Sequence, residues 1–131
     1  MATEILINDG GAPARILPYT AAEAIVAGDA CTIDGNGELQ KADSANGSGQ
    51  GFAYAGIALT NAADGDIASL ITGVGVVLNI NCANVNAGVA MMMGTTAGQL
   101  LTATQATTDP KTQAVTLENN SGAGLTKCQT L

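Results

Sequence analysis

Aromatic and basic side chains are scarce in this sequence of 131 residues, which contains no Trp, one Phe and two Tyr. Its 4 basic residues are outnumbered by 11 acidic ones, for a net charge of −7. Nucleic-acid binding depends on clustered Lys or Arg side chains and on aromatic side chains that stack on bases, so we expect no nucleic-acid partner. No run reaches the roughly 18 apolar residues of a membrane-spanning helix, and "MATEILINDGG" lacks the basic segment and apolar run typical of a secretory signal. The sequence therefore predicts no membrane association.

Histidine is also absent, which removes the base that most often activates a Ser or Cys nucleophile. Cys31, Cys82 and Cys128 are widely spaced, and without His they lack the usual zinc co-ligands. We expect three buried, reduced thiols. The composition accordingly predicts a protein without metal or cofactor, without catalytic residues and without a small-molecule substrate.

Carboxylates offer the one remaining route to catalysis or metal binding. Asp64 with Asp66, and Asp34 with Glu38, form candidate acid–base pairs, but both pairs lie in Gly-rich turns, where Asp commonly bonds to the local backbone. The stretch 34–38 also places oxygen ligands at alternate positions, as a calcium loop does, without the later Glu of an EF-hand. An enzyme that works through carboxylates alone and a weak calcium site remain as alternatives.

The sequence contains an internal repeat with a spacing of about sixty residues. "AGDACTIDGNGELQKA" at 27–42 matches "AGVAMMMGTTAGQLLTA" at 87–103, and Leu59-Thr60-Asn61 matches Leu117-Glu118-Asn119. The first copy is predicted at about 25–71 and the second at about 85–131, with a linking strand between them. Repeats of this length indicate a duplicated supersecondary unit.

Short apolar stretches with a period of two, such as "DIASLITG" and "QAVTLENN", alternate with Gly-rich turns, a pattern typical of all-β proteins. Each copy is predicted to be a pair of hairpins joined by polar loops at 44–51 and 104–111. The capping-box spacing of Thr20 to Glu23 would also permit a short helix, but so short a helix is marginal, and we expect extended structure. The chain is thus predicted to be mainly all-β, a small barrel-like domain over 25–131.

The first 24 residues have no evident counterpart in the second copy and are predicted to form an extended N-terminal arm. The core of the domain is rich in Ala and Val, and small side chains bury little apolar area. We therefore expect association with other molecules to supply part of the stability.

The pattern "V-x-A-G-D", then "G-x-L-x-x-A", then "A-G-I-A-L-x-x-A-x-x-G-D" resembles the small head-decoration, or cement, proteins of tailed bacteriophages, including those similar to the lambda head-stabilising protein. The matching residues are Val26 to Asp29, Gly37, Leu39, Ala42, Ala55 to Leu59, Ala62, Gly65 and Asp66. The second copy departs from the pattern, because Val89 stands where the first has Asp29. The resemblance implies a small β-rich domain called a β-tulip, assembled as a homotrimer.

The resemblance also implies a location and a partner: the virion, on the outer surface of the capsid, after assembly in the host cytoplasm, with the major capsid protein as partner. An N-terminal arm commonly reaches the coat protein in this family, so residues 3–8 and 14–19 are the candidates for capsid contact. The residues named for that contact are Ile5, Leu6, Ile7, Arg15, Ile16, Leu17 and Tyr19. A tail, fibre or surface-adhesion module of similar composition is the alternative.

Overall fold

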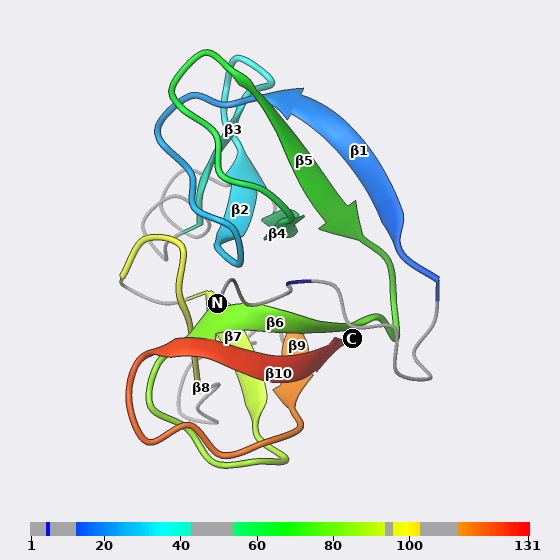
Figure 1. Ribbon diagram of the computed structural model, residues 1–131, viewed down its shortest axis with the longest axis vertical. Coiled ribbons are helices and arrows are strands. Elements are labelled where there is room, and N and C mark those ends of the chain that lie inside the picture. The colour runs from blue at the N-terminus through cyan, green and yellow to red at the C-terminus, as the bar shows by residue number, and fades with distance from the viewer. Residues whose placement is uncertain (1–4, 6–12, 43–53, 94–95, 103–112) are drawn as a thin grey trace.

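The computed structural model describes residue 5 and residues 13–42, 54–93, 96–102 and 113–131. These residues form ten β-strands and no helix, so the all-β prediction is confirmed (Figure 1). No helix in this part of the chain is long and apolar enough to span a membrane. The strands are β1 (Arg15–Thr20), β2 (Ala30–Ile33), β3 (Leu39–Lys41), β4 (Tyr54–Ala58), β5 (Ile67–Thr72), β6 (Val77–Cys82), β7 (Ala90–Met93), β8 (Leu100–Thr102), β9 (Ala114–Thr116) and β10 (Gly124–Thr130).

The predicted alternation of apolar and polar residues is present in the strands. In β6 the side chains of Leu78, Ile80 and Cys82 are buried, whereas Asn79 and Asn81 between them are half-buried. Successive side chains of a strand point to opposite faces of a sheet, so this period of two directs one face to the core. The residues after Thr20, where a short helix was the alternative, form no helix. Ala21 and Ile25 make isolated bridges, with a bend at residues 22–23 between them.

The strands form two sheets with the same internal order. In the first unit (β1–β5) the order is β1-β5-β4-β2-β3. In the second unit (β6–β10), read from its own first strand, the order is β6-β10-β9-β7-β8. Figure 1 shows the first unit above the second, with β6 and β10 crossing beneath it. Each unit therefore places its first strand beside its fifth, and then continues through its fourth, second and third strands.

Each sheet also curls until its first strand meets its third. Cys82 in β6 pairs in parallel with Leu100 in β8, and Ala21 after β1 forms the matching parallel bridge with Leu39 in β3. Each contact is a single residue pair, so the second sheet is a curled sheet joined at one point rather than a fully hydrogen-bonded barrel.

The turns repeat as well as the strands. The N–H of Ala27 donates to Asn61 Oδ1 at 2.8 Å in the first unit, and the N–H of Ala87 donates to Asn119 Oδ1 at 2.8 Å in the second. These are the Asn residues of the matched Leu-x-Asn triplets. The duplication in the sequence thus corresponds to a duplication of hydrogen bonds.

The structure differs from the predicted N-terminal arm at residues 15–20. These residues form β1, which pairs with β5 along its whole length from Arg15 opposite Thr72 to Thr20 opposite Ile67. β6, in the stretch predicted as a linking strand, pairs with β10 in the same way. β1 and β6 are therefore equivalent first strands, and residues 15–20 belong to the sheet rather than to an arm. The similarity of "RILPYT" and "VLNINC" is only in apolar alternation, too weak to align.

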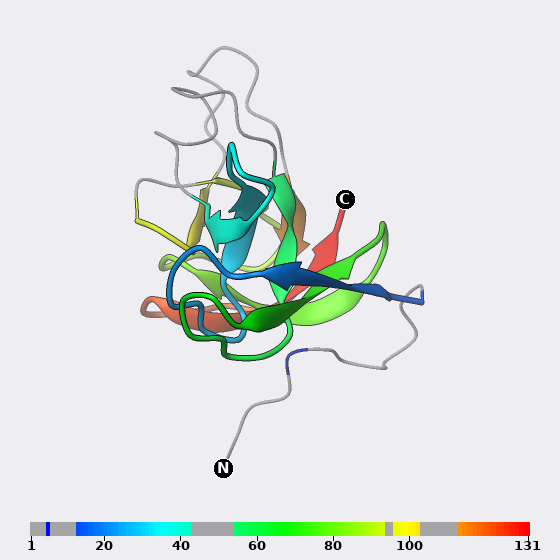
Figure 2. The same ribbon diagram turned by 90° about the horizontal axis from the view of Figure 1, so that it is seen from above.

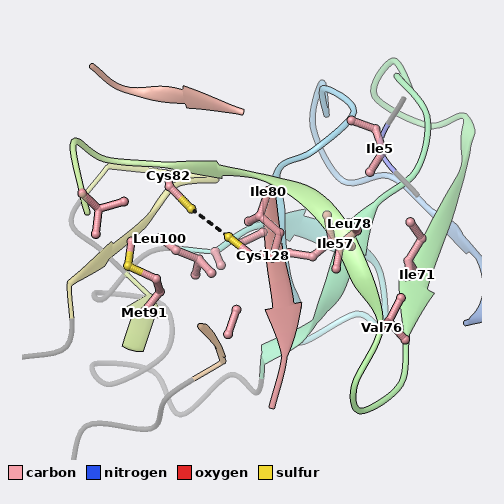
Figure 3. Close-up of a cluster of buried hydrophobic side chains, with 14 residues drawn as sticks. Ile5, Ile57, Ile71, Val76, Leu78, Ile80, Cys82, Met91, Leu100 and Cys128 are labelled. Atoms are coloured by element: carbon pink, nitrogen blue, oxygen red, sulfur yellow. Dashed lines mark hydrogen bonds between the residues drawn. The ribbon is translucent and has the colours of Figure 1, made fainter. Parts of the chain in front are cut away.

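Two groups of buried side chains form the core. The smaller group lies inside the first unit and includes Ile25, Leu39 and Leu70. The larger lies inside the second unit and between the units, and includes Ile57, Ile71, Leu78 and Leu100 (Figure 3). Neighbouring residues of one strand divide between the two groups, since Leu70 belongs to the first and Ile71 to the second. The first sheet is therefore covered by apolar side chains on both faces.

Candidate interaction surface

The two units meet at a junction built around the buried side chain of Asp29, which is 4% exposed. Asp29 Oδ2 accepts a hydrogen bond from the N–H of Val26 at 3.0 Å, and Oδ1 accepts one from the side-chain amide of Asn81 at 3.2 Å. Lys41 Nζ lies 3.9 Å from the carboxylate. A buried charge is tolerated only when it is paired and hydrogen-bonded, and Asp29 has partners in both units. It therefore serves as a polar connection between them.

Backbone hydrogen bonds complete this junction. The N–H of Asn81 donates to the carbonyl of Gly28 at 2.8 Å, and the N–H of Ala30 donates to the carbonyl of Gly98 at 2.8 Å. A Cβ on Gly28 would lie 2.3 Å from Leu125 Cδ2, and one on Gly98 would lie 2.9 Å from Asp29 Cγ. Both glycines have positive φ. The two units approach so closely that these positions have no room for a side chain.

The structure places Ile5, the first predicted capsid-contacting residue, inside this junction. Its side chain is 5% exposed and belongs to the larger core group. Its carbonyl accepts a hydrogen bond from the N–H of Asn79 at 2.6 Å, on the side of β6 that faces away from β10. Ile5 is thus committed to the chain's own fold. Leu6 and Ile7 lie outside the described residues.

The four predicted contact residues of β1 are divided between two faces. Arg15 and Ile16 are exposed, whereas Leu17 and Tyr19 are half-buried. Tyr19 packs against the small core of the first unit. Of the apolar candidates in β1, Ile16, at 47% exposure, is the one whose side chain is mainly open to solvent.

β1 is an edge strand, and a row of mainly apolar side chains lies along one of its faces. It ends the order of the first sheet, and Figure 2 shows it along the outside of that unit beside β5. Ile16, Pro18 and Thr20 share one face of β1, and Ile67 lies directly opposite Thr20. Proline is typical of edge strands, because its missing N–H costs no ladder bond there. We call these four residues the β1–β5 edge.

Ile67 was not selected from the sequence, although it is 64% exposed. The signal was present in the repeat: its position in β5 corresponds to that of Leu125 in β10, because each pairs across the ladder with an equivalent residue, Thr20 or Asn81. The sequence distinguishes Asp29 only through its contrast with Val89 in the second copy, and does not identify it as a residue of the junction. When one copy has a charged residue and the other has an apolar residue at the equivalent position, the two copies have different neighbours there.

The carboxylate pairs lie in turns, as the sequence suggested. Asp34 Oδ1 accepts hydrogen bonds from the N–H groups of Asn36 at 2.8 Å and Glu38 at 2.9 Å, which is the local backbone bonding expected of Asp in a turn. Asp66 donates its backbone N–H to Ala63 within the next turn. Among the residues that the structure describes, no three His, Cys, Asp or Glu side chains are grouped to hold a metal ion.

The three cysteines are buried free thiols, as predicted. Burial, and secondarily the negative charge of Asp29, raises the pKa of Cys31 to about 12. Cys82 and Cys128 face each other with their sulfur atoms 3.8 Å apart (Figure 3). The hydrogen bond between them lowers the pKa of Cys82 and raises that of Cys128. Burial likewise raises the pKa of Tyr54, which lies against the larger core. The raised pKa values keep Cys31, Cys128 and Tyr54 neutral at physiological pH.

Comparison with known proteins gives a likeness of fold. No protein-family model matches the chain, and no curated protein matches it. Among solved structures, the chain is similar to the crystal structure of the head fibre gp8.5 N base of bacteriophage phi29, with a TM-score of 0.61 and 10% sequence identity. The similarity covers 91% of this chain and 95% of that one. At this identity the match concerns the fold, and it includes both units.

Proposed function

We propose that this chain is a structural protein of a bacteriophage particle, associated with the head. The observation that carries the proposal is the fold shared over 91% of the chain with the base of a phage head fibre. The sequence pattern "V-x-A-G-D" with its continuation, which resembles that of head-decoration proteins, is independent of that comparison. Two separate lines thus favour the same part of the same kind of particle.

The finer proposal is that the chain decorates the outer surface of the capsid as a homotrimer and bridges subunits of the major capsid protein. Packaged DNA presses outward on a capsid, and a trimer bound to several coat subunits must release all its contacts before they separate. Simultaneous contacts can exceed the affinity of one contact by about 10²–10⁴. Modest interfaces from a small acidic protein are then sufficient, and no catalysis or cofactor is needed.

The set of residues proposed for capsid contact is smaller than the set expected from the sequence. Ile5 contributes its side chain to the core, and Leu17 and Tyr19 are half-buried. Arg15 and Ile16 remain exposed on β1, and Leu6 and Ile7 remain candidates from the sequence. Because β1 belongs to the sheet, removing residues 1–19 would damage the fold. Substitutions at Arg15 and Ile16 are the sharper probes.

Co-sedimentation of the purified chain with heads of the phage that carries its gene tests the proposal. Binding is expected, and Arg15→Glu combined with Ile16→Asp should weaken it at least about tenfold, a loss of about 1.4 kcal/mol. Leu117→Asp, at a position that is 41% exposed in the second unit, is the matched control and should bind as the wild type. No binding to heads by a folded wild-type chain would refute the proposal.

A second candidate, the base of a fibre rather than a distributed cement, is favoured by the similar structure itself, which is the base of a head fibre. Gold-labelled antibody on intact particles distinguishes the two candidates. Label over the whole head supports decoration, whereas label restricted to a projecting fibre or to the tail supports the second candidate. Asp64→Asn with Asp66→Asn should leave head binding unchanged, since these side chains lie in a turn.

A further inference from the structure

The junction between the units has a donor side and a receptor side. On the donor side, the turn at Gly28 inserts its carbonyl and its bare Cα into the second unit. On the receptor side, the N–H of Asn81 in β6 binds that carbonyl, while Leu125 in β10 covers the glycine. Gly28 is buried as a result. Because the units are duplicates, each of these parts has an equivalent in the other unit.

The equivalent of the donor is the turn at Gly88 in the second unit. It has the same left-handed backbone, with φ of +78° against +94° at Gly28. The same Asn hydrogen bond holds it, from Ala87 to Asn119. Unlike Gly28, Gly88 is exposed, and no described atom lies within 4 Å of a Cβ built there. The second unit therefore presents a preformed copy of the donor turn to solvent.

The equivalent of the receptor is the β1–β5 edge of the first unit. Ala21 donates its N–H to the carbonyl of Asp66, the residue before β5. N–H groups alternate in direction along a strand, so the N–H of Thr20 points away from β5, as that of Asn81 points away from β10. Ile67 occupies the position of Leu125 and is 64% exposed, against 39% for Leu125. Among the described residues, β1 pairs with β5 alone. The first unit thus presents an unused receptor.

We propose that these two parts bind each other between copies of this chain: the Gly88 turn of one copy docks on the β1–β5 edge of another. The carbonyl of Gly88 accepts a hydrogen bond from the N–H of Thr20, and Ile67 packs over Gly88, as Leu125 packs over Gly28 within the chain. A second contact follows from the same equivalence. Gly37, whose φ of +79° matches the +81° of the junction residue Gly98, lies where its carbonyl accepts the N–H of Ala90.

Some residues of the internal junction have different equivalents in the proposed contact. These differences favour association between separate chains. The buried Asp29 and its hydrogen-bond partner Asn81 are replaced by Val89 and Thr20. An interface that buries Val and Ile desolvates no charge, so it avoids the cost of a buried ion. Pro18 stands where Asn79 binds the carbonyl of Ile5 within the chain, and it has no N–H to offer. The intermolecular site therefore accepts the Gly88 turn without a counterpart of Ile5.

The donor and receptor lie on different units, so the contact is head-to-tail. Each copy uses its second unit to bind the first unit of the next, and such heterologous contacts generate closed rings or open filaments. This inference is independent of head binding: a chain that associates in this manner but ignores phage heads would retain it, and a monomer that binds heads would lose it.

Solution mass of the full chain, measured by light scattering over a range of concentrations, is the first test. The wild type is expected to exceed the mass of one chain. Ile67→Lys and Gly88→Asn should each weaken association at least about tenfold, and Asn is chosen because it tolerates a left-handed backbone. Val74→Lys, at an exposed position in the turn between β5 and β6, should associate as the wild type. A folded wild type that stays a single chain, or an assembly that neither variant weakens, would overturn the inference.

Cross-linking identifies the partners directly. A Thr20→Cys chain is mixed with an Asn86→Cys chain, whose new thiol is exposed beside the Gly88 turn and leaves Gly88 itself unchanged. The mixture is treated with a short bismaleimide, which spares the three buried native thiols. A product containing one chain of each kind is expected, at a yield several times that of Thr20→Cys mixed with Val74→Cys. Equal yields in the two mixtures would contradict the head-to-tail contact even if the chain forms oligomers.

Discussion

The two units of this chain have the same strand order but different surroundings. In the second unit the outer side of β6 is covered by Ile5 and Gly28, whereas the corresponding side of β1 in the first unit ends the sheet. In the first unit the turn at residue 28 is buried, whereas the turn at 88 is exposed. Duplication therefore supplied the internal junction with both of its halves, and left one further copy of each half on the surface.

The closing contact of each unit gives the largest expected effect on stability. Leu39 and Leu100 are equivalent, both fully buried, and each lies at the parallel pair that joins the third strand to the first. Leu39→Ala and Leu100→Ala should each lower the free energy of unfolding by about 2–5 kcal/mol, measured by chemical denaturation. If one of them costs almost nothing, the two units do not close alike.

The next largest effect on stability should come from alkaline pH, which titrates a thiol of the first unit that the second unit lacks at the equivalent position. Cys31 in β2 is a buried thiol, while the equivalent position in β7 is Met91, which does not titrate. Burial raises the pKa of Cys31 from its ordinary value of 9.0 to about 12, so between these values the unfolded chain loses a proton that the folded chain keeps. Cys31 then stabilises the fold fully below pH 9 and progressively less above it. Unfolding free energy should fall by about 1.4 kcal/mol per pH unit from this thiol.

The hydrogen bond with Cys82 raises the pKa of Cys128, and burial raises that of Tyr54, so both groups should add to the decline at alkaline pH in the wild type and in Cys31→Ala alike. In denaturation curves recorded from pH 8 to 12, Cys31→Ala should show a shallower decline than the wild type, despite its lower stability at pH 8. Parallel curves for the two proteins would exclude Cys31 as a source of the pH dependence.

Two equivalent glycines should give an intermediate and unequal effect. Gly37 and Gly98 have nearly the same positive φ, but a Cβ at Gly37 meets no atom within 4 Å, while one at Gly98 lies 2.9 Å from the Asp29 carboxylate. Gly37→Ala should cost about 1–2 kcal/mol from backbone strain alone. Gly98→Ala should cost about 1–3 kcal/mol more, because it disturbs a buried hydrogen-bonded group. If the two variants lose equal stability in thermal unfolding, the junction accommodates the methyl group at position 98 without a further loss of free energy.

The matched asparagines should give the smallest effect and an equal one. Asn61→Ala and Asn119→Ala each remove one side-chain acceptor from a turn N–H, for about 0.5–1.5 kcal/mol. Differential scanning calorimetry compares the two variants. A loss confined to Asn61→Ala would show that this bond matters only where the turn is docked, which would sharpen the contrast between the buried and the exposed turn.

The repeat, the strand period and the Gly-rich turns could be predicted from the sequence because each depends on local chemistry. A left-handed turn selects Gly, and a half-buried strand selects alternating residues, whatever lies beyond them. The sheet order and the place of β1 could not be predicted in this way. "RILPYT" contains a Pro, as many loops do, and only its pairing with a strand some fifty residues later distinguishes an edge strand from an arm.

The candidate surfaces were less accessible to sequence reasoning. An exposed Ile67 and a buried Leu39 are alike as letters, and Ile5 in an apolar N-terminal segment resembles a free arm until the carbonyl bond from Asn79 is known. The mismatch between Asp29 and Val89 was the useful signal, because a buried charge needs a partner and an apolar residue at the same place in the repeat does not. Comparing the copies with each other would have pointed to the junction.

The central claim is that this chain acts by attachment to a phage head, and cryo-electron microscopy of purified heads with and without the chain tests it most directly. The account predicts repeated two-lobed, all-β density on the outer surface of the heads that carry the chain, absent from those that lack it. Identical reconstructions, together with a chain that remains in solution as a free protein, would contradict it.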